Sequence, residues 1–396
     1  MNSSLPGAVL DACGVPAHYG NPFAEQSRLV AGKAFTDLSF VEVVVVSGQD
    51  RLTWLHNLTT RDFTNLAPGE SSEMLLLDPN GHIQAAAGVV DDGERTWFLM
   101  DRGQAEPFAA FLESMVFRMR VEIGRPEYDV VGVVIPRSEE KTSGGDADGG
   151  EAAEGTESSV ATAPAGDPPA DFLPAEVAAL AELVWEDPWP RTLPGGAHYG
   201  VADSEHSARA SRRVLVLVKP GAPVVEAFMA AGYSPAGLQA WEAQRVADWR
   251  PRPNNEIVAR ALPHELDWLR TAVHLEKGCY RGQETVAKLV NLGKPPRRLT
   301  YLYLEGPEGD LPAAGSEIKL GEKTVGVLTS VARDYEEGPV ALALIKRNTA
   351  LDAQLSVGGF IAAQVEIVSR EGKSSASPAQ RPGAGMRGVG HRTLGA

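Results

Sequence analysis

Cysteine is scarce in this sequence of 396 residues, where it occurs only as Cys13 and Cys279. Two thiols so far apart do not make a disulfide framework, and they indicate a reducing cytoplasm. No C-x-x-C pair and no Cys/His cluster with zinc spacing occurs, which excludes thioredoxin-like exchange and a structural zinc site. An iron–sulfur cluster normally needs about four protein ligands. We therefore predict no metal site in the isolated chain, although Cys279 could be one ligand of a cluster shared with another chain.

Long apolar runs are also missing. Runs such as Val41–Val46 and Val214–Val218 are far too short to span a bilayer. The N-terminal stretch has neither a basic region nor a sustained apolar core, so we expect no signal peptide. The phosphate-binding pattern G-x-x-x-x-G-K-[ST] is absent as well. These features favour a cytoplasmic protein that does not associate with membranes.

Positive charge is in deficit, since the formal net charge is −15. About half of the excess lies in Ser138–Asp171, where nine acidic residues face one lysine. This segment has almost nothing to bury and is predicted to be a disordered acidic linker. The rest of the chain is mildly acidic, so direct binding of nucleic acid is not expected.

The hydrophobic pattern before the linker predicts the order β-α-β-β-β-α-β-β after an irregular N-terminal arm. This order indicates an antiparallel α+β layer structure rather than a doubly wound parallel sheet. The predicted strands are Val41–Val46, Met74–Leu77, Ile83–Val90, Thr96–Met100, Arg120–Ile123 and Val130–Ile135, and the predicted helices are Gln49–Leu58 and Gln104–Phe117.

Beyond the linker, the pattern predicts a strand, two helices and then a series of short strands separated by glycine turns. The short strands suggest a small closed or sandwiched β-domain. In order, the elements are the strand Arg213–Val218, the helices Ala222–Ala231 and Leu238–Trp249, and the strands Leu299–Leu304, Glu317–Leu320, Lys323–Arg333, Pro339–Ile345 and Phe360–Ile367.

The segment around Cys279 has a chemical character of its own. A short helix is predicted at Thr285–Val290, so the thiol lies just ahead of a helix N-terminus, whose dipole favours a thiolate. Lys277 and Arg281 act in the same direction, and the flanking glycines leave room for a ligand or a partner backbone. From these residues alone, a reactive thiolate and a small buried hydrophobe in a turn are both open.

The run Lys277–Glu284, KGCYRGQE, resembles the K-G-C-[YF]-x-G-Q-E signature of the YgfZ family of folate-binding proteins. That family shares the fold of GcvT, the aminomethyltransferase of the glycine cleavage system. Leu262–Glu265 and Arg297–Leu299 resemble further family segments, and Leu38–Leu99 agrees more weakly.

This resemblance implies a ring of antiparallel α+β subdomains around a central channel, with a C-terminal β-barrel. The expected parts are a GcvT-like N-terminal α+β domain (1–137), a disordered acidic insert (138–172), a second α+β domain carrying the motif (173–297), the barrel (298–369) and a disordered tail (370–396). It also implies a tetrahydrofolate-binding accessory protein of iron–sulfur cluster assembly or repair, including for enzymes that modify tRNA. Its partners would be assembly proteins or client iron–sulfur enzymes, and its cofactor tetrahydrofolate or a one-carbon derivative.

The resemblance also suggests roles for individual residues. Cys279 would be the reactive thiol, with Lys277 beside it, and Glu265 would hold the pterin ring. Arg245 is a weaker candidate for folate binding, and Tyr280 would either stack on folate or pack the channel wall. The remaining motif residues expected near the opening are Gly278, Arg281, Gly282, Gln283 and Glu284.

One departure from the GcvT pattern affects the expected activity. GcvT enzymes carry a carboxylate in the strand after a G-G-[IV] turn, whereas the matching stretch here, Gly81–Ala87, contains none. Without it no evident group stabilises the transferred one-carbon centre. An accessory role is therefore favoured over a folate-dependent transferase acting on an unknown acceptor. A third alternative is a nucleic-acid-binding module that uses Lys294, Arg297 and Arg298.

Overall fold

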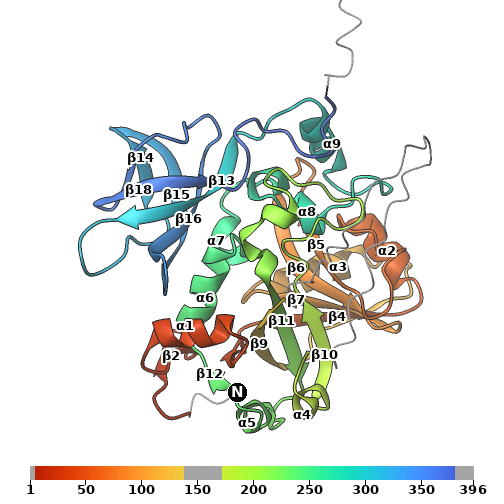
Figure 1. Ribbon diagram of the computed structural model, residues 1–396. Helices are drawn as coiled ribbons and strands as arrows, with labels where there is room; N and C mark the ends of the chain where they lie inside the picture. The colour runs from red at the N-terminus through yellow and green to blue at the C-terminus, as the bar shows by residue number, and fades with distance from the viewer. Residues whose placement is uncertain (1–4, 138–171, 380–396) are drawn as a thin grey trace, which may run out of the picture.

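The structure is a computed structural model that describes residues 5–137 and 172–379 (Figure 1). The predicted acidic insert lies outside the described residues except for Phe172, as does the predicted tail beyond residue 379. No helix among the described residues is both long and apolar enough to cross a membrane.

The first sheet confirms the predicted β-α-β-β-β-α-β-β order, whose last strand, β9, joins the second sheet. Along β6, Ala85, Ala87 and Val89 pack against the helices on one face, while Val90 joins the core on the other. The strand alternation therefore gives this sheet two buried faces. In sheet order, the strands are β5 (Ser71–Leu77), β6 (Ile83–Asp91), β7 (Arg95–Met100), β4 (Glu42–Ser47) and β8 (Glu122–Gly124), and the covering helices are α2 (Arg51–Leu58) and α3 (Ala105–Met115).

The second sheet combines strands from both sides of the acidic insert. Strand β9, before the insert, pairs along its whole length with β11, after it. The predicted boundary between two α+β domains therefore does not separate two sheets. In sheet order, the strands are β10 (Ala181–Glu186), β11 (Ser211–Val218), β9 (Asp129–Pro136), β3 (Ala34–Asp37) and β12 (Ser234–Pro235), with the helices α4 (Ala175–Ala178) and α5 (Val224–Ala230) on the outer face.

The expected irregular N-terminal arm is instead structured. After the short pair β1 (Val9–Leu10) and β2 (Pro16–His18), helix α1 (Pro22–Val30) begins with an Asn21 side chain that accepts from the backbone N–H of Ala24. An Asn cap followed by proline at the first helical position is a common helix start. Helix α1 packs on α6 (Leu238–Ala247).

The C-terminal strands close into a six-stranded barrel, as predicted. Its order is β13 (Arg297–Glu305), β16 (Gly338–Lys346), β15 (Lys323–Asp334), β14 (Glu317–Leu320), β17 (Leu355–Val357) and β18 (Phe360–Glu366). Its interior holds its own core, which includes Leu302, Leu328 and Phe360.

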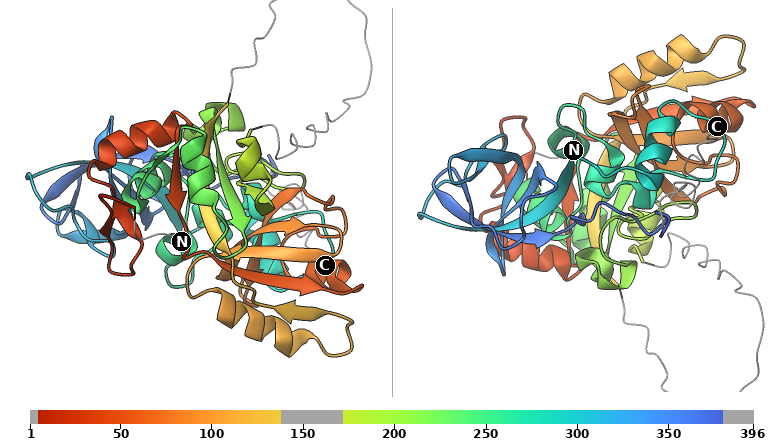
Figure 2. Two further views of the ribbon diagram at one scale, coloured as in Figure 1. Left: turned by 90° about the horizontal axis from the view of Figure 1, so that it is seen from below. Right: turned by 90° about the horizontal axis from the view of Figure 1, so that it is seen from above.

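The two five-stranded sheets face each other, and the barrel lies to one side of them (Figures 1 and 2). The facing sides share one hydrophobic core, which contains Trp97 of the first sheet, Leu217 of the second and Trp241 of α6. The chain then passes through the short helices α7 (Pro253–Glu256), a 3₁₀ turn (Pro263–Leu266), α8 (Leu269–Ala272) and α9 (Gln283–Asn291) to reach the barrel.

The start of the predicted disordered tail follows a defined path. Residues 370–379 lie against the loop at His198, where the backbone N–H of Ser375 donates to the His198 carbonyl at 2.9 Å. This part of the tail prediction differs from the structure, because backbone pairing orders a segment whose composition alone suggests disorder.

Candidate functional site

A cavity of about 760 Å³, counting its open mouth, lies where the facing sides of the two sheets meet α6 and the residues that follow it. The indole rings of Trp185, Trp241 and Trp268 form part of its wall. Glycines make room for two of these rings: a Cβ at Gly88 would lie 2.6 Å from Trp185, and one at Gly132 would lie 2.7 Å from Trp241. Both glycines are thus explained by close packing of an indole on the backbone.

Arg250 is the central charged group of the wall. Its Nη2 donates to Glu73 at 2.6 Å and its Nε donates to Asp187 at 2.9 Å. Glu73 also accepts from the hydroxyl of Thr271. Burial raises the pKa of Glu73, and the positive charge of Arg250 partly offsets this rise. In all, the wall carries four carboxylates and four guanidinium groups: Glu73, Asp101, Asp187, Glu242, Arg213, Arg245, Arg250 and Arg252.

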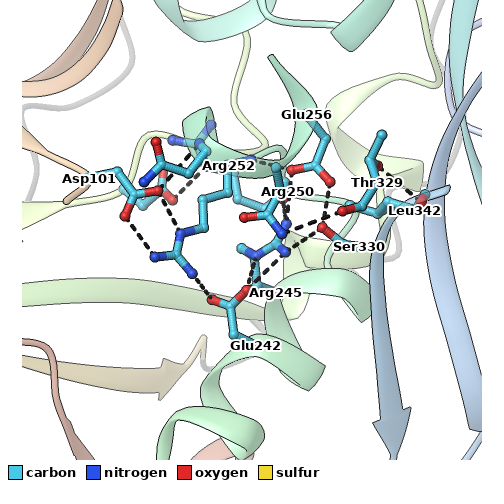
Figure 3. Close-up of polar contacts among 12 residues, drawn as sticks. Asp101, Glu242, Arg245, Arg250, Arg252, Glu256, Thr329, Ser330 and Leu342 are labelled. Atoms are coloured by element: carbon cyan, nitrogen blue, oxygen red, sulfur yellow. Dashed lines mark hydrogen bonds and ion pairs between the residues drawn. The ribbon is translucent and has the colours of Figure 1, made fainter. Parts of the chain in front are cut away.

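A chain of ion pairs connects the cavity to the barrel (Figure 3). Arg252 holds the Asp101 carboxylate with two hydrogen bonds of 2.8 and 2.7 Å and lies 3.3 Å from Glu242. Arg245 donates to Glu242 at 2.9 Å and to Ser330 of β15 at 2.8 Å. Burial raises the pKa of Glu242, but Arg245 and Arg252 outweigh it and lower the pKa to about 2.

Several buried polar atoms of this region have no hydrogen-bond partner among the described residues. They include Nη1 of Arg213, Nη1 of Arg250 and Nε1 of Trp268. Oδ2 of Asp248 also lacks a hydrogen bond and lies 3.9 Å from Arg213. Burial lowers the pKa of Arg213 to about 10 and raises the pKa of Asp248 to about 7. Unpaired buried groups cost free energy, so the interior of this wall is polar and incompletely paired.

The predicted folate contact Arg245 does line the cavity, but its guanidinium is bound to the protein. Besides Glu242 and Ser330, it contacts the carboxylate of Glu256 and the carbonyl of Arg250. Arg245 therefore holds the wall together rather than presenting free donors to a ligand.

Glu265, expected to hold a pterin ring, does not line the cavity. It is fully buried, and Arg297 grips its carboxylate with hydrogen bonds of 2.8 and 2.7 Å. The backbone N–H of Leu262 donates to it as well, at 3.0 Å. In this geometry Glu265 closes its own 3₁₀ turn and ties it to strand β13, and the pterin contact stays a prediction.

The motif loop is anchored through Lys277. Its ammonium donates to the carbonyl oxygens of His56, Thr59 and Arg61, at and just after the end of α2. Burial lowers the pKa of Lys277 to about 7, while Asp62 opposes the shift. With three acceptors around it, the ammonium positions the loop and does not point to a ligand.

The other motif residues shape the loop. Gly282 adopts a φ of +84°, and a Cβ there would lie 2.6 Å from the carbonyl oxygen of Asp78. The side-chain amide of Gln283 donates to the carbonyl of Lys277 at 3.2 Å. Tyr280 is buried in the core, with the Lys277 ammonium 5.0 Å from its ring centroid, and it does not line the cavity. Arg281 and Glu284 are exposed.

Cys279 is exposed, so the alternative of a buried hydrophobe in a turn is wrong. It lies four residues before α9, as predicted. The structure does not bring it to the cavity wall. The cavity wall and the thiol loop belong to one continuous segment, which runs from Trp268, in the wall, to Lys277, at the start of the motif.

The sequence analysis missed most of the wall. Three of its eight charged residues, Asp187, Arg250 and Arg252, lie in two short runs that combine tryptophan, proline and charge, Trp185–Pro190 and Asp248–Pro253. Charged residues are rarely buried, so their position beside tryptophan in these runs was the sequence feature that could have indicated the cavity wall.

Two absences bear on the chemistry. The wall includes Ala86 and Ala87 of the stretch Gly81–Ala87, which contains no carboxylate. Within residues 5–137 and 172–379, no three His, Cys, Asp or Glu side chains are grouped so that they could hold a metal ion.

The basic residues considered for nucleic acid binding do not form an open patch. Arg298 is fully buried, Arg297 is engaged by Glu265, and Lys294 lies 3.8 Å from Glu371.

Comparison with known proteins assigns the fold. No protein-family model matches the sequence. A chloroplastic protein of Arabidopsis thaliana described as a putative transferase is 25% identical over 386 residues, which cover 94% of this chain and 80% of the relative. The crystal structure of aminomethyltransferase T of the glycine cleavage system from Bartonella henselae matches with a TM-score of 0.65 and 17% identity, over 93% of this chain and 95% of that one. The chain thus has the mixed α+β fold of aminomethyltransferase T, with a closed C-terminal barrel.

Proposed function

We propose that this protein binds tetrahydrofolate or a one-carbon derivative in the cavity between the sheets, and acts through Cys279 as an accessory factor in iron–sulfur cluster assembly or repair. The observation that carries the folate part is the cavity itself, whose wall combines three tryptophans with charged side chains. The sequence motif around an exposed thiol carries the second part.

The residues of the cavity fit a pterin. A flat bicyclic ring needs apolar faces, which Trp185, Trp241 and Trp268 offer. Its amino group and ring N–H need an acceptor, and carboxylates such as Asp187 accept strongly. Its carbonyl oxygen needs donors, and four guanidinium groups line the cavity. When bound, tetrahydrofolate would supply the site with a carried one-carbon unit.

Filling the cavity should abolish folate binding. Leu215 of β11 is half-buried in the wall. We expect Leu215→Trp to weaken tetrahydrofolate binding at least tenfold, because the added ring occupies ligand space while the strand keeps a residue with high β-propensity. Isothermal titration calorimetry of wild type and variant measures this effect.

The matched control is Ile361→Trp, at an exposed strand position on the barrel. It should leave the affinity unchanged. Equal affinity of the Leu215→Trp protein and wild type, with both folded, would place any folate site elsewhere. No binding by wild type would leave a scaffold or partner-docking role.

The thiol should be required in cells. We expect Cys279→Ala to fail to restore iron–sulfur enzyme activity in a strain that lacks this protein. The equally exposed Cys13 provides the control, and Cys13→Ala should complement fully. Complementation by Cys279→Ala at wild-type level would remove the thiol from the function.

A folate-dependent transferase is the second candidate, favoured by the Arabidopsis relative described as a putative transferase. The alanines of β6 weigh against it, and Asp101, a carboxylate in the wall, is already held by Arg252. Turnover of a methylene- or formyl-folate by the purified protein would favour this candidate over the accessory role.

A further inference from the structure

A histidine–aspartate pair lies directly beside the loop that carries Cys279. Nδ1 of His56, in the last turn of α2, is 2.9 Å from Oδ1 of Asp62. Asp62 is itself fixed by the backbone N–H and hydroxyl of Thr64 and by the amide of Asn65, at 2.7–2.9 Å. Burial raises the pKa of Asp62, but these hydrogen bonds and the nearby His56 outweigh it and hold the pKa well below its usual range. The carboxylate therefore stays ionised and orients the imidazole.

The free nitrogen of this imidazole is turned to the motif loop. With Nδ1 engaged by Asp62, Nε2 is the remaining site, and no hydrogen bond to it is formed within the described part of the chain. A Cβ built on Gly278 would lie 3.7 Å from this Nε2 atom. Because Gly278 has no side chain, the exposed backbone of the loop lies close to the imidazole, and Cys279 is the next residue.

The loop is held in this position by the same helix end. The Lys277 ammonium donates a hydrogen bond to the carbonyl of His56 itself, so the start of the motif loop is attached to the residue that carries the imidazole. A base, its orienting carboxylate and an exposed thiol are the parts of an activated nucleophile, and their hydrogen bonds are often loose without substrate.

We propose that His56, oriented by Asp62, is the general base that deprotonates Cys279 and makes it a nucleophile toward small disulfides and other soft electrophiles. The proposal deepens the role proposed for Cys279 and does not depend on folate. In this arrangement Gly278 leaves the space between the imidazole and the thiol free of a side chain.

The thiol–disulfide exchange needs only the Cys279 thiol, the His56 imidazole and the disulfide substrate. The Sγ proton moves to Nε2 of His56, and the thiolate attacks one sulfur of the disulfide. A new S–S bond forms as the old one breaks, and the leaving thiolate takes the proton back from His56. Two further titratable groups interact with Asp62, namely Lys277 and His274. The exposed Arg281 and Glu284 lie just before and within the first turn of α9.

The test is the pH dependence of thiol reactivity. Cys13→Ser serves as background so that one thiol remains, and the rate of alkylation by iodoacetamide is followed from pH 5 to 10 in full-length protein. We expect His56→Gln to lower the rate at pH 7 about tenfold and to move the rising part of the pH–rate profile to higher pH, since the thiolate is the reacting form. The rate at the high-pH plateau should not change. Exchange with oxidised glutathione at pH 7 should fall in parallel.

A matched control is His82→Gln, because His82 also pairs with an aspartate, Asp78, at 2.9 Å. It should leave the profile unchanged. An unshifted profile in folded His56→Gln protein, or equal shifts in both variants, would overturn the proposal. Asp62→Asn should give a smaller shift in the same direction, and calorimetric folate binding should be normal in all three variants.

Discussion

Replacing Arg250 by methionine should lower the free energy of unfolding by roughly 3–5 kcal/mol, because it leaves buried carboxylates without their counter-charge. Arg250 is 7% exposed and is the shared partner of Glu73 and Asp187, which are buried too. Methionine keeps much of the side-chain volume, so the loss is electrostatic and not a cavity effect. Urea unfolding at pH 8 measures it.

The deficit of the Arg250→Met protein should shrink at lower pH. In wild type, burial already raises the pKa of Glu73, and losing the arginine raises it further. A carboxyl whose folded pKa lies above its unfolded pKa favours the folded state at low pH, and this contribution disappears as the pH rises through the folded pKa. The variant should therefore be closer to wild type at pH 5 than at pH 8.

The control for this prediction is Arg120→Met. Arg120 also forms a salt bridge with an aspartate, Asp50, but its side chain is 64% exposed. It should change stability little, since water replaces the lost partner. A comparable loss in both variants, or a pH-independent deficit in Arg250→Met, would contradict a buried-charge origin.

Glu265→Gln should destabilise the protein by about 2–3 kcal/mol, within the range for hydrogen bonds to charged groups. The substitution removes the charge from a fully buried carboxylate that accepts from Arg297 and from the N–H of Leu262. The cost stays moderate because the Arg297 side chain is 28% exposed and can turn to water. Thermal unfolding of both proteins provides the measurement.

The same variant separates the structural role from the role first predicted for Glu265. Tetrahydrofolate affinity, measured well below the unfolding temperature, should stay within about twofold of wild type. Lost affinity together with wild-type stability would restore Glu265 as a ligand contact. The substitution Glu284→Gln, at an exposed motif position, should alter neither quantity.

The candidate site could be predicted only in part. A motif of consecutive residues can be recognised in the sequence, and the prediction that Cys279 lies ahead of a helix is confirmed. Arg245 was found in the wall, although its donors are bound to Glu242, Glu256 and Ser330. The wall as a whole was out of reach, because Glu73, Asp187 and Arg250 meet only when two sheets and a helix pack together.

Local chemistry explains which parts of the fold the sequence determined by itself. Short apolar runs and glycine turns were sufficient to predict the strands of the first sheet and the barrel, since strand and turn preferences act between neighbours in the chain. The same holds for α1, whose Asn21-Pro22 start was present in the sequence but not used.

Only the tertiary structure decided which segments share a sheet and which charges face each other. Strand β9 pairs with β11 across the acidic insert, and no local pattern specifies a partner so distant in the chain. It also decided that Glu265 faces Arg297, and that His56 and Asp62 lie beside the thiol loop. The sequence does not distinguish a solvated charged residue from a paired or a catalytic one, because its role depends on the groups that folding brings within a few ångströms of it.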